Sequence, residues 1–598
     1  MNVISKRSIK SVVVILVITF LLVGLSGCDL FNLNLKFDEI SFTEATDILF
    51  ASLLDGDGLA INVFLDNPNK YEFESKKIAV PLPDSSESEY DQKKDSSNSA
   101  INDIVYELNK LRNLTDAEKI ERSAITSSLD NMTSYYSLYF REYIGANGPA
   151  ADVPSNLAIF RFKTLEDIEI YLEYLTDLTA AFDSYVSFEE SKCIEGYGRS
   201  DDFYKRAIEA YRNIAPLNVE TSDHNFVLDF NEKIDNVTFP ITSTYKAIYK
   251  EQNLEKVDIL LDAYRSMADE IESLLTTYPT SNRNQGGLAG FNKGSDYYNY
   301  EIFQKSTGTT LRINIGHLKL VNYIKDLQGK MNQSMPVDID NLLNQIYASA
   351  DNAFTIENAE TVMAKLIDNM SDDFPIIENS PDVSFKLLKQ SEQKAFVAGY
   401  YLRTPVDNLN ATENIYINPN VTESSIYNLI SHEGFPGHMF QNTYLKSKSV
   451  NKLRLLLTNT AWAEGWAEYC EEYAAEYFST DALLGNAYKI YVLNNKLNMA
   501  LRSYADIMVN FSNYTASKLK EAIKSEFELD FSEETCENLV NVAASFPGMY
   551  LPYTFGDIMI KEIKEAYFAK SSYLADIDFH TKLLEIGPMD FDELKSYM

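Results

Sequence analysis

Residues 432–438 carry the side chains of this chain that are best suited to chemistry. His432 and His438 stand at the two ends of the segment H-E-G-F-P-G-H, and Glu433 directly follows the first of them. They are two of only five histidines in the chain. Two imidazoles and a further carboxylate can hold Zn²⁺ and leave a fourth position open for water, whose proton Glu433 can accept. The residue types therefore predict a zinc hydrolase site.

The spacing of the two histidines requires a break in the local helix. Zinc-binding histidines on one helical face are four residues apart, but His432 and His438 are six apart, which turns them roughly 240° from each other on a regular helix. Between them lie Gly434, Pro436 and Gly437, and these residue types permit unusual φ/ψ or remove a helical donor. If both imidazoles bind one metal, we expect a loop or bulge between them. The alternative is a Gly-Pro loop that carries two solvated histidines.

A second acidic motif follows at residues 462–472, W-A-E-G-W-A-E-Y-C-E-E. The segment has helical character, and Glu464 and Glu468 share one face of the expected helix. Both tryptophans of the chain are here, so we expect the helix to be buried, and buried carboxylates need a cation or hydrogen-bond partners. A zinc ion would neutralise Glu464, and Glu468 would hold the free N–H of a histidine ligand. The alternative is an acidic patch on the surface.

Several ordered blocks in the last half of the chain resemble a known family. It is the domain of unknown function 885 family of bacterial lipoproteins, which is similar to the gluzincin zinc metallopeptidases. The blocks are G-S-D-Y-Y with S-T-G-T (residues 294–298 and 306–309), residues 400–418, residues 432–441, E-G-W-A-E (residues 464–468) and residues 546–556. The resemblance implies His432, His438 and Glu464 as zinc ligands and Glu433 as the general base. It also implies that a strand at residues 414–418 forms a wall along which an extended peptide could lie.

The resemblance extends to two further residues. It implies that Tyr553 stabilises the oxyanion, a role that suits a phenol donor aimed at developing charge; an ordinary core tyrosine is the alternative. Asn510 stands where family members usually carry a histidine, in the block R-S-Y-A-D-I-M-V-N at residues 502–510. If that histidine contacts substrate, activity or specificity would be altered here, although an asparagine can still donate a hydrogen bond.

The first residues have the features of a bacterial lipoprotein signal. A basic start precedes an apolar stretch too short for a comfortable membrane span, and L-S-G-C at residues 25–28 resembles a lipobox. We expect a signal peptide over residues 1–27 and lipidation at Cys28. The alternative is an uncleaved N-terminal anchor. Either reading places the protein outside the cytoplasm, in the cell envelope and tethered to a membrane.

Charge and cysteine content exclude some classes of protein. The formal net charge of −35 argues against nucleic-acid binding, which needs clustered Lys and Arg, and suits a soluble, self-repelling surface. Apart from Cys28, the cysteines are Cys193, Cys470 and Cys536, and none has metal-type spacing. No disulfide framework is expected.

The rest of the chain is expected to be mainly helical. Apolar residues recur at helical spacing in residues 101–111, 157–178, 257–275 and 339–347. Residues 83–99 are polar and indicate a loop or linker, while residues 281–310 are rich in Gly and Asn and indicate a break. We expect a tether and N-terminal segment with a polar linker (residues 28–100), an N-terminal helical region (101–290) and a catalytic region (291–598). By the resemblance, the fold is a large helical zincin-like (gluzincin) body with a small β-sheet next to the active site.

These observations lead to one functional hypothesis and two rivals. The hypothesis is a membrane-tethered, extracytoplasmic zinc metallopeptidase that hydrolyses peptide bonds with a zinc-activated water and Glu433 as general base. One rival is a catalytically impaired relative that binds peptides at the surface, motivated by Asn510. The other is a zinc amidohydrolase that acts on cell-wall peptides or small amides.

Overall fold

The fold is described from a computed structural model, which covers residues 40–145, 148–334, 338–389, 398–421, 424–448, 450–571 and 573–598. The expected signal peptide and the lipidation site Cys28 lie outside these ranges. Among the helices described, none is both long and apolar enough to cross a membrane.

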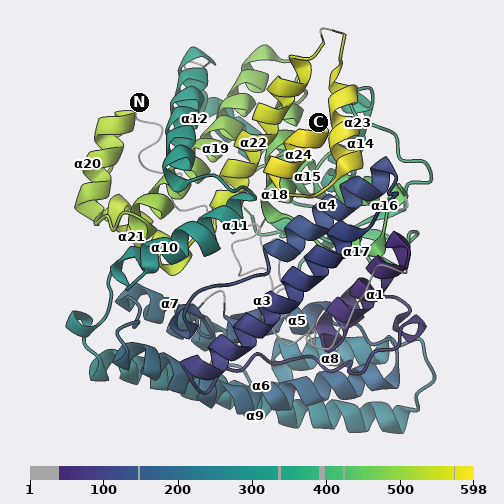
Figure 1. The fold of residues 1–598 in the computed structure, drawn as a ribbon, viewed down its shortest axis with the longest axis vertical. Helices are drawn as coiled ribbons and strands as arrows, with labels where there is room; N and C mark the ends of the chain where they lie inside the picture. The colour runs from purple at the N-terminus through teal and green to yellow at the C-terminus, as the bar shows by residue number, and fades with distance from the viewer. Residues whose placement is uncertain are drawn as a thin grey trace.

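A lower layer of helices forms one side of the molecule (Figure 1). Here α6 and α9 pack along each other over a shared apolar core. Threonine side chains cap the first turns of these two long helices, Thr164 for α6 and Thr242 for α9. The helices of this layer are α5 (Pro149–Ile159), α6 (Leu165–Ile194), α7 (Asp201–Ile214), α8 (Asn225–Asp235) and α9 (Ser243–Thr277).

The larger upper body contains the candidate site and its own apolar core, in which Trp462 and Trp466 are fully buried. Its helices are α12 (Ile313–Ser334), α13 (Ile339–Ala348), α14 (Ile356–Met370), α15 (Ile426–Glu433), α16 (His438–Ser447), α17 (Lys452–Leu456), α18 (Thr460–Ala475), α19 (Ala482–Asn510), α20 (Ala516–Phe527), α21 (Glu533–Ser545), α22 (Leu551–Phe568), α23 (Asp576–Ile586) and α24 (Phe591–Tyr597). The prediction of a mainly helical fold is confirmed. The expected helices at residues 257–275 and 339–347 are found within α9 and in α13.

Most of residues 83–99, predicted as a loop or linker, belong to a helix instead. Helix α3 (Glu87–Lys110) begins at the cap residue Ser86 and continues into the apolar half that was predicted. The linker prediction was wrong because polar residues can hold a helical turn without an apolar face. Local ion pairs such as Lys93 with Glu89, at 2.8 Å and four residues apart, support this solvated part of α3.

The N-terminal segment is packed against the C-terminal half of the chain. Helices α1 (Phe42–Leu54) and α2 (Gly58–Phe64) share an apolar core with α3, α4 (Asp116–Asp130) and the leucines of α17. Helix α4 also contacts α24 at the other end of the sequence. The described part of the N-terminal segment, residues 40–100, is therefore an integral part of the fold, whereas the expected tether before it lies outside the described residues. The region expected at 101–290 is divided between the two layers.

One predicted break takes a more specific form in the structure, and one segment predicted as helical contains a break that was not expected. Residues 281–310 fold as a run of short helical turns, with α10 (Gly294–Tyr297), a π-helix at Tyr298–Phe303 and α11 (Gln304–Thr307). Residues 157–178, which the apolar spacing joined, belong to the end of α5 and the start of α6. The chain leaves the helix between them and restarts at the capping box of Thr164.

A three-stranded sheet lies beside the candidate site, in the order β1-β3-β2. Strand β3 (Glu413–Ile417) pairs in parallel with β1 (Val383–Leu387) and in antiparallel with β2 (Gly399–Leu402). The strand predicted at residues 414–418 is thus confirmed. Its expected role as a wall for an extended peptide is not, because both edges of β3 are already paired and only an edge strand can accept another.

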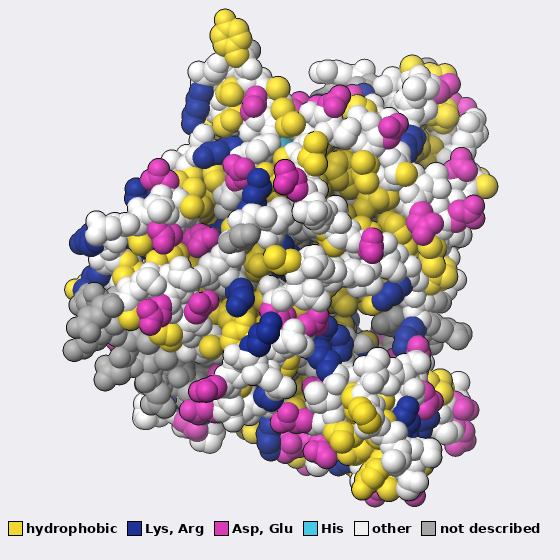
Figure 2. Space-filling view, turned by 90° about the vertical axis from the view of Figure 1, so that its right-hand side faces the viewer, with side chains coloured by type: hydrophobic (Ala, Val, Ile, Leu, Met, Phe, Trp, Pro, Cys, Tyr) yellow, Lys and Arg dark blue, Asp and Glu magenta, His cyan; other side chains and the backbone are white. Residues whose placement is uncertain are grey.

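Acidic and basic side chains are interspersed over the face shown in Figure 2, together with scattered apolar side chains. This face has no broad basic surface of the kind that nucleic-acid binding needs.

Candidate metal centre

The predicted helix break is present between the two histidines. Helix α15 ends at Glu433 and α16 begins at His438, and both glycines between them have backbone angles outside the helical region, with ψ of −114° at Gly434 and −137° at Gly437. A Cβ atom on Gly437 would lie 1.8 Å from the carbonyl oxygen of His432, so only glycine fits this close approach. The Phe435–Pro436 peptide bond within the loop is cis.

The break lets both imidazoles turn toward one carboxylate. The Nε2 atoms of His432 and His438 each lie 3.6 Å from Oε2 of Glu464, and the two rings are nearly perpendicular with centroids 4.8 Å apart. One ligand atom from each of the three residues lies within 4.8 Å of the other two. The structure therefore brings the predicted ligand set together from three separate helices.

The atoms that meet here have no hydrogen-bond partner among the described residues. They are Nε2 of His432, Nε2 of His438 and both carboxylate oxygens of Glu464, all in side chains that are at most 5% exposed. Buried polar atoms in folded proteins are almost always paired, and an unpaired buried carboxylate is costly. Two nitrogens and a carboxylate are a donor set that suits Zn²⁺ in an open site. The residues present thus fit the metal that the sequence predicted.

Helix α18 holds its carboxylates inside the protein. Asn459 caps its first turn by accepting the N–H of Trp462 at 2.9 Å, and Trp466 donates its indole N–H to the Pro436 carbonyl at 2.8 Å. The second contact ties the helix that carries Glu464 to the loop between the histidines. Because Glu464 is fully buried, the alternative of a surface acidic patch is excluded, and burial of both imidazoles likewise excludes two solvated histidines.

Glu433 lies beside the three candidate ligands with one oxygen anchored. Its Oε2 accepts the backbone N–H of Tyr401 in β2 at 2.9 Å, while its Oε1 is buried without a hydrogen-bond partner among the described residues. Burial raises the pKa of Glu433, although the neighbouring imidazoles oppose that shift. A carboxyl group with a raised pKa and one free oxygen is suited to accept and return a proton.

The carboxylate that orients His432 is Glu471, whereas Glu468 was predicted for a histidine N–H. Nδ1 of His432 lies 2.7 Å from Oε1 of Glu471, one helical turn beyond Glu468. Glu468 points instead toward the buried Lys496, whose Nζ is 3.6 Å from its Oε2. The prediction failed because Glu471 and Glu468 share a face of α18, and spacing alone does not show which of them meets the ring.

The electrostatics of the site call for positive charge. Burial by itself lowers the pKa of His432, but contacts with Glu464 and Glu471 and the charge of Glu433 raise it well above the ordinary value. The two imidazoles in turn lower the pKa of Glu464 against the opposing effect of burial. A divalent cation among these carboxylates would supply the charge that they require.

Tyr553 is brought to the site by a close crossing of α18 and α22. A Cβ atom on Gly465 would lie 2.2 Å from the backbone of Gly556, and one on Gly556 would lie 2.0 Å from the carbonyl oxygen of Ala461. Tyr553 is one turn before Gly556, and it is near enough to Glu464 and Glu433 that their charges, after burial, raise its pKa well above its usual value. The structure thus places the predicted oxyanion donor beside the predicted ligand and base.

Asn510 is occupied by contacts within the protein. Its Oδ1 accepts the N–H of Leu288 at 2.9 Å, and its Nδ2 donates to Asp506 at 2.7 Å and to the Ala543 carbonyl at 2.8 Å. The side chain is fully buried, and all its donors are in use. The suggested substrate contact is therefore replaced by a structural role that links α19 to α21 and to the segment before α10.

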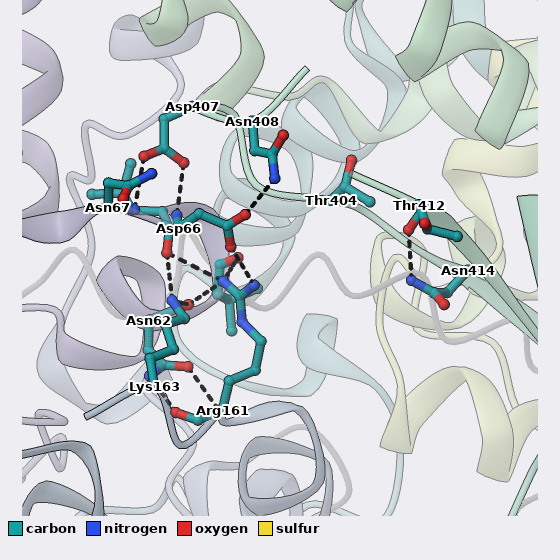
Figure 3. Close-up of polar contacts among 12 residues, drawn as sticks. Asn62, Asp66, Asn67, Arg161, Lys163, Thr404, Asp407, Asn408, Thr412 and Asn414 are labelled. Atoms are coloured by element: carbon teal, nitrogen blue, oxygen red, sulfur yellow. Dashed lines mark hydrogen bonds and ion pairs between the residues drawn. The ribbon is translucent and has the colours of Figure 1, made fainter. Parts of the chain in front are cut away.

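A polar junction holds the loop that follows β2 (Figure 3). Asp407 in this loop accepts the backbone N–H groups of Asp66 and Asn67 at 2.7 and 2.9 Å, and Asp66 in turn pairs with Arg161 at 2.8 Å. Arg161 also donates to the backbone carbonyls at the end of α2. A cavity of about 310 Å³ adjoins the junction between α2 and the start of α6. The N-terminal segment, the lower layer and the β2–β3 connection therefore meet here.

The remaining histidines and cysteines are not among the candidate ligands, although Cys470 donates from Sγ to the Pro436 carbonyl in the loop between His432 and His438, at 3.5 Å. His224 and His580 bond backbone carbonyls at 2.8 and 2.7 Å. The three described cysteines, Cys193, Cys470 and Cys536, are buried and free.

Comparison with known proteins identifies the family. The family described as "Bacterial protein of unknown function (DUF885)" matches residues 77–598. The chain belongs to this family. No curated protein matches the sequence.

Two solved structures share the fold of this DUF885 chain. One is a lipoprotein candidate from Colwellia psychrerythraea, with a TM-score of 0.74 and 18% identity over 93% of this chain and 97% of that one. The other is a lipoprotein candidate of unknown function from Shewanella oneidensis, with a TM-score of 0.61 and 14% identity over 93% and 99% of the two chains. At these identities the likeness shows a common architecture.

Proposed function

We propose that this protein is a zinc-dependent metallopeptidase related in mechanism to the gluzincins. The observation that carries the proposal is the convergence of unpartnered, buried Nε2 atoms of His432 and His438 on the equally unpartnered carboxylate of Glu464. A zinc ion held there would polarise a scissile carbonyl and lower the pKa of a water molecule at the site. The adjacent Glu433, with one oxygen free, distinguishes a hydrolytic site from a purely structural one.

In the proposed reaction, the chain's own residues move one proton and stabilise one charge. Glu433 accepts the proton of the attacking water at Oε1 and later returns it to the leaving amine, while the Tyr401 N–H keeps Oε2 in place. Glu471 fixes the ring of His432 through Nδ1. The hydroxyl of Tyr553 donates a hydrogen bond to the oxyanion that forms on the carbonyl oxygen.

Access and location belong to the same proposal. We infer that the lower helical layer covers the approach to the site and restricts substrates to short or unfolded peptides. We also infer a cell-envelope location with a lipid anchor at Cys28, because L-S-G-C at residues 25–28 resembles a lipobox and both structural relatives are described as lipoprotein candidates.

The test combines metal content with turnover. Purified protein is expected to contain one zinc per chain and to cleave members of a peptide library, whereas Glu433→Gln retains the zinc and loses about 10²- to 10⁴-fold in kcat. Zinc without cleavage in either protein would favour the impaired peptide-binding relative. Cleavage of cell-wall peptides or small amides alone would favour the amidohydrolase. Absence of stoichiometric zinc, with His432→Ala unchanged in stability, would exclude the metal site.

A further inference from the structure

Behind the candidate site, a single buried lysine joins three helices. Lys496 of α19 is 2% exposed. It donates to the Glu468 carbonyl of α18 at 2.8 Å, and its Nζ lies 3.0 Å from Oδ1 of Asp557 in α22. The carboxylates of Glu468 and Glu472 are 3.6 and 3.5 Å from the same nitrogen. A cation so enclosed stabilises the relative positions of the three helices. Removing it would leave the buried Glu468 carboxylate without this cation, whereas Asp557 and Glu472 would keep their pairs with Lys561.

Two of the partners of Lys496 are one helical turn from residues of the site. Asp557 follows Tyr553 by four residues on α22, and Glu468 follows Glu464 by four residues on α18, so each pair shares a helix face. A force on Asp557 is therefore transmitted to Tyr553 through a single turn of helix.

The crossing of α18 and α22 does not by itself fix the rotation of α22 about its own axis. Backbone contact between Gly465 and Gly556 sets how close α18 and α22 approach, but glycines have no side chains that would stop α22 from rotating about its axis. The contact between Lys496 and Asp557 lies one residue beyond this crossing and opposes such rotation from the α19 side, while Tyr323 and Lys561 hold the other oxygen of the same carboxylate.

We propose that Lys496 is a positioning residue, which holds α22 through Asp557 so that the Tyr553 hydroxyl faces the reacting carbonyl. This rests on the proposed function for its catalytic consequence, but the placement of Tyr553 can be measured without any reaction. Lys496 touches neither substrate nor metal ligand atoms in this scheme. Its charge acts only through the rotation of α22.

The Lys496 ammonium also lies beside a second group of possible ligand atoms around His432. His432, Glu468 and Glu471 also lie close enough to hold a cation. However, Nδ1 of His432 is bonded to Glu471, and the Lys496 ammonium already faces Glu468, so a fixed internal charge stands where a second ion would be needed.

The first experiment places a 3-fluorotyrosine at position 553 of the full chain and records its ¹⁹F NMR resonance. Lys496→Met and Asp557→Asn are each expected to shift or broaden the resonance. Lys564→Met is the matched control, because Lys564 is a lysine on the helix of Tyr553, α22, but pairs with Asp576 at 2.6 Å. It should leave the resonance unchanged. Asp557→Asn keeps the test decisive if Lys496→Met does not fold, and an unchanged resonance in the folded variants would overturn the proposal.

The second experiment is a double-mutant cycle on peptide turnover. We expect Lys496→Met to lower kcat by about 10- to 100-fold with little change in KM, since small misplacements of a catalytic group are costly. In a Tyr553→Phe background the same change should cost less than about threefold, because the group that it positions is gone. Fully multiplicative losses would show a general structural effect and contradict the proposal. If the wild-type protein has no turnover, the proposed function fails, while the NMR experiment still decides the positioning role.

Discussion

Two polar clusters in this protein, one buried and one half-buried, differ in whether their atoms find partners inside the chain. At the candidate metal centre, imidazole nitrogens and carboxylate oxygens converge and remain unpartnered within the described residues. At the junction of Figure 3, Asp66, Arg161 and Asp407 satisfy one another and the nearby backbone. The first cluster therefore offers polar atoms that a bound group could satisfy, whereas the members of the second satisfy one another.

The comparison predicts that added zinc stabilises the protein through the candidate metal centre and not through the junction. Zinc should stabilise the wild-type protein by about 4 kcal/mol when its concentration is a thousand times Kd, because only the folded chain forms the centre. In His438→Ala, both the stoichiometric zinc and this stabilisation should be lost. Metal analysis and urea unfolding with and without zinc measure the two effects.

His317→Ala is the control for that experiment. His317 is a partly buried histidine of α12 that contacts the Tyr504 ring and is not among the candidate ligands. It should keep its zinc. Equal zinc binding by His438→Ala and the wild type would remove the contrast between the two clusters.

A second prediction concerns the helix crossing that assembles the unpaired cluster. Gly556→Ala should destabilise the fold by about 3 kcal/mol, the upper part of the range for overpacking, because its Cβ would lie 2.0 Å from a backbone carbonyl that cannot move aside. It should also lower kcat by displacing Tyr553. Chemical denaturation and peptide turnover check these outcomes.

Gly329→Ala provides the matched control for the crossing. It is also a glycine within a helix, but a Cβ there meets nothing within 4 Å. Removing a helical glycine should then stabilise the protein by about 0.5–1 kcal/mol. A similar destabilisation by both substitutions would show that close approach is not what Gly556 provides.

The sequence was most informative where chemistry and backbone geometry constrain nearby residues. The histidine spacing predicted the break at Gly434 and Gly437, and the tryptophans predicted a buried α18. Sequence could not identify Glu471, Lys496 or Tyr401 as partners of the site, because these contacts depend on how separate elements cross. The only available signal was that Glu471 lies one turn beyond Glu468 on the same face.

The errors have equally specific causes. The polar start of α3 was assigned to a linker because its helix is supported by ion pairs rather than by burial. The family resemblance suggested that Asn510 could stand at a substrate-contacting position, but its side-chain hydrogen bonds to Asp506 and Ala543 were invisible in the sequence. The central position of β3 followed from pairing between distant segments, which alternation alone does not reveal.

The third prediction tests the self-satisfied cluster. Arg161→Ala should cost about 2 kcal/mol of stability, because it leaves Asp66 and the Val63 carbonyl at the end of α2 without a charged donor. The junction is built without a metal, so zinc content should not change. Unfolding by urea and metal analysis of the same preparations measure the two quantities, and loss of zinc in this variant would show that the clusters are not independent.

The smallest predicted effect comes from an acid that belongs to neither kind of cluster. Burial raises the pKa of Asp152, in the first turn of α5, to about 7. A folded-state pKa above the unfolded value means that stability is fully present at low pH and is lost as pH rises through about 7. Asp152→Asn cannot ionise, so its stability relative to the wild type should increase between pH 6 and pH 8, by roughly 1.4 kcal/mol.

Urea unfolding of the two proteins at unit pH steps gives this difference directly, because shifts from all other groups cancel. Asp116→Asn serves as the control, since Lys119 lowers the pKa of Asp116 and its titration falls below the range measured. Its profile should run parallel to that of the wild type. A parallel profile for Asp152→Asn as well would mean that Asp152 is solvated in solution. In that case Asp152 could no longer be contrasted, as a buried acid, with the paired acids of the junction.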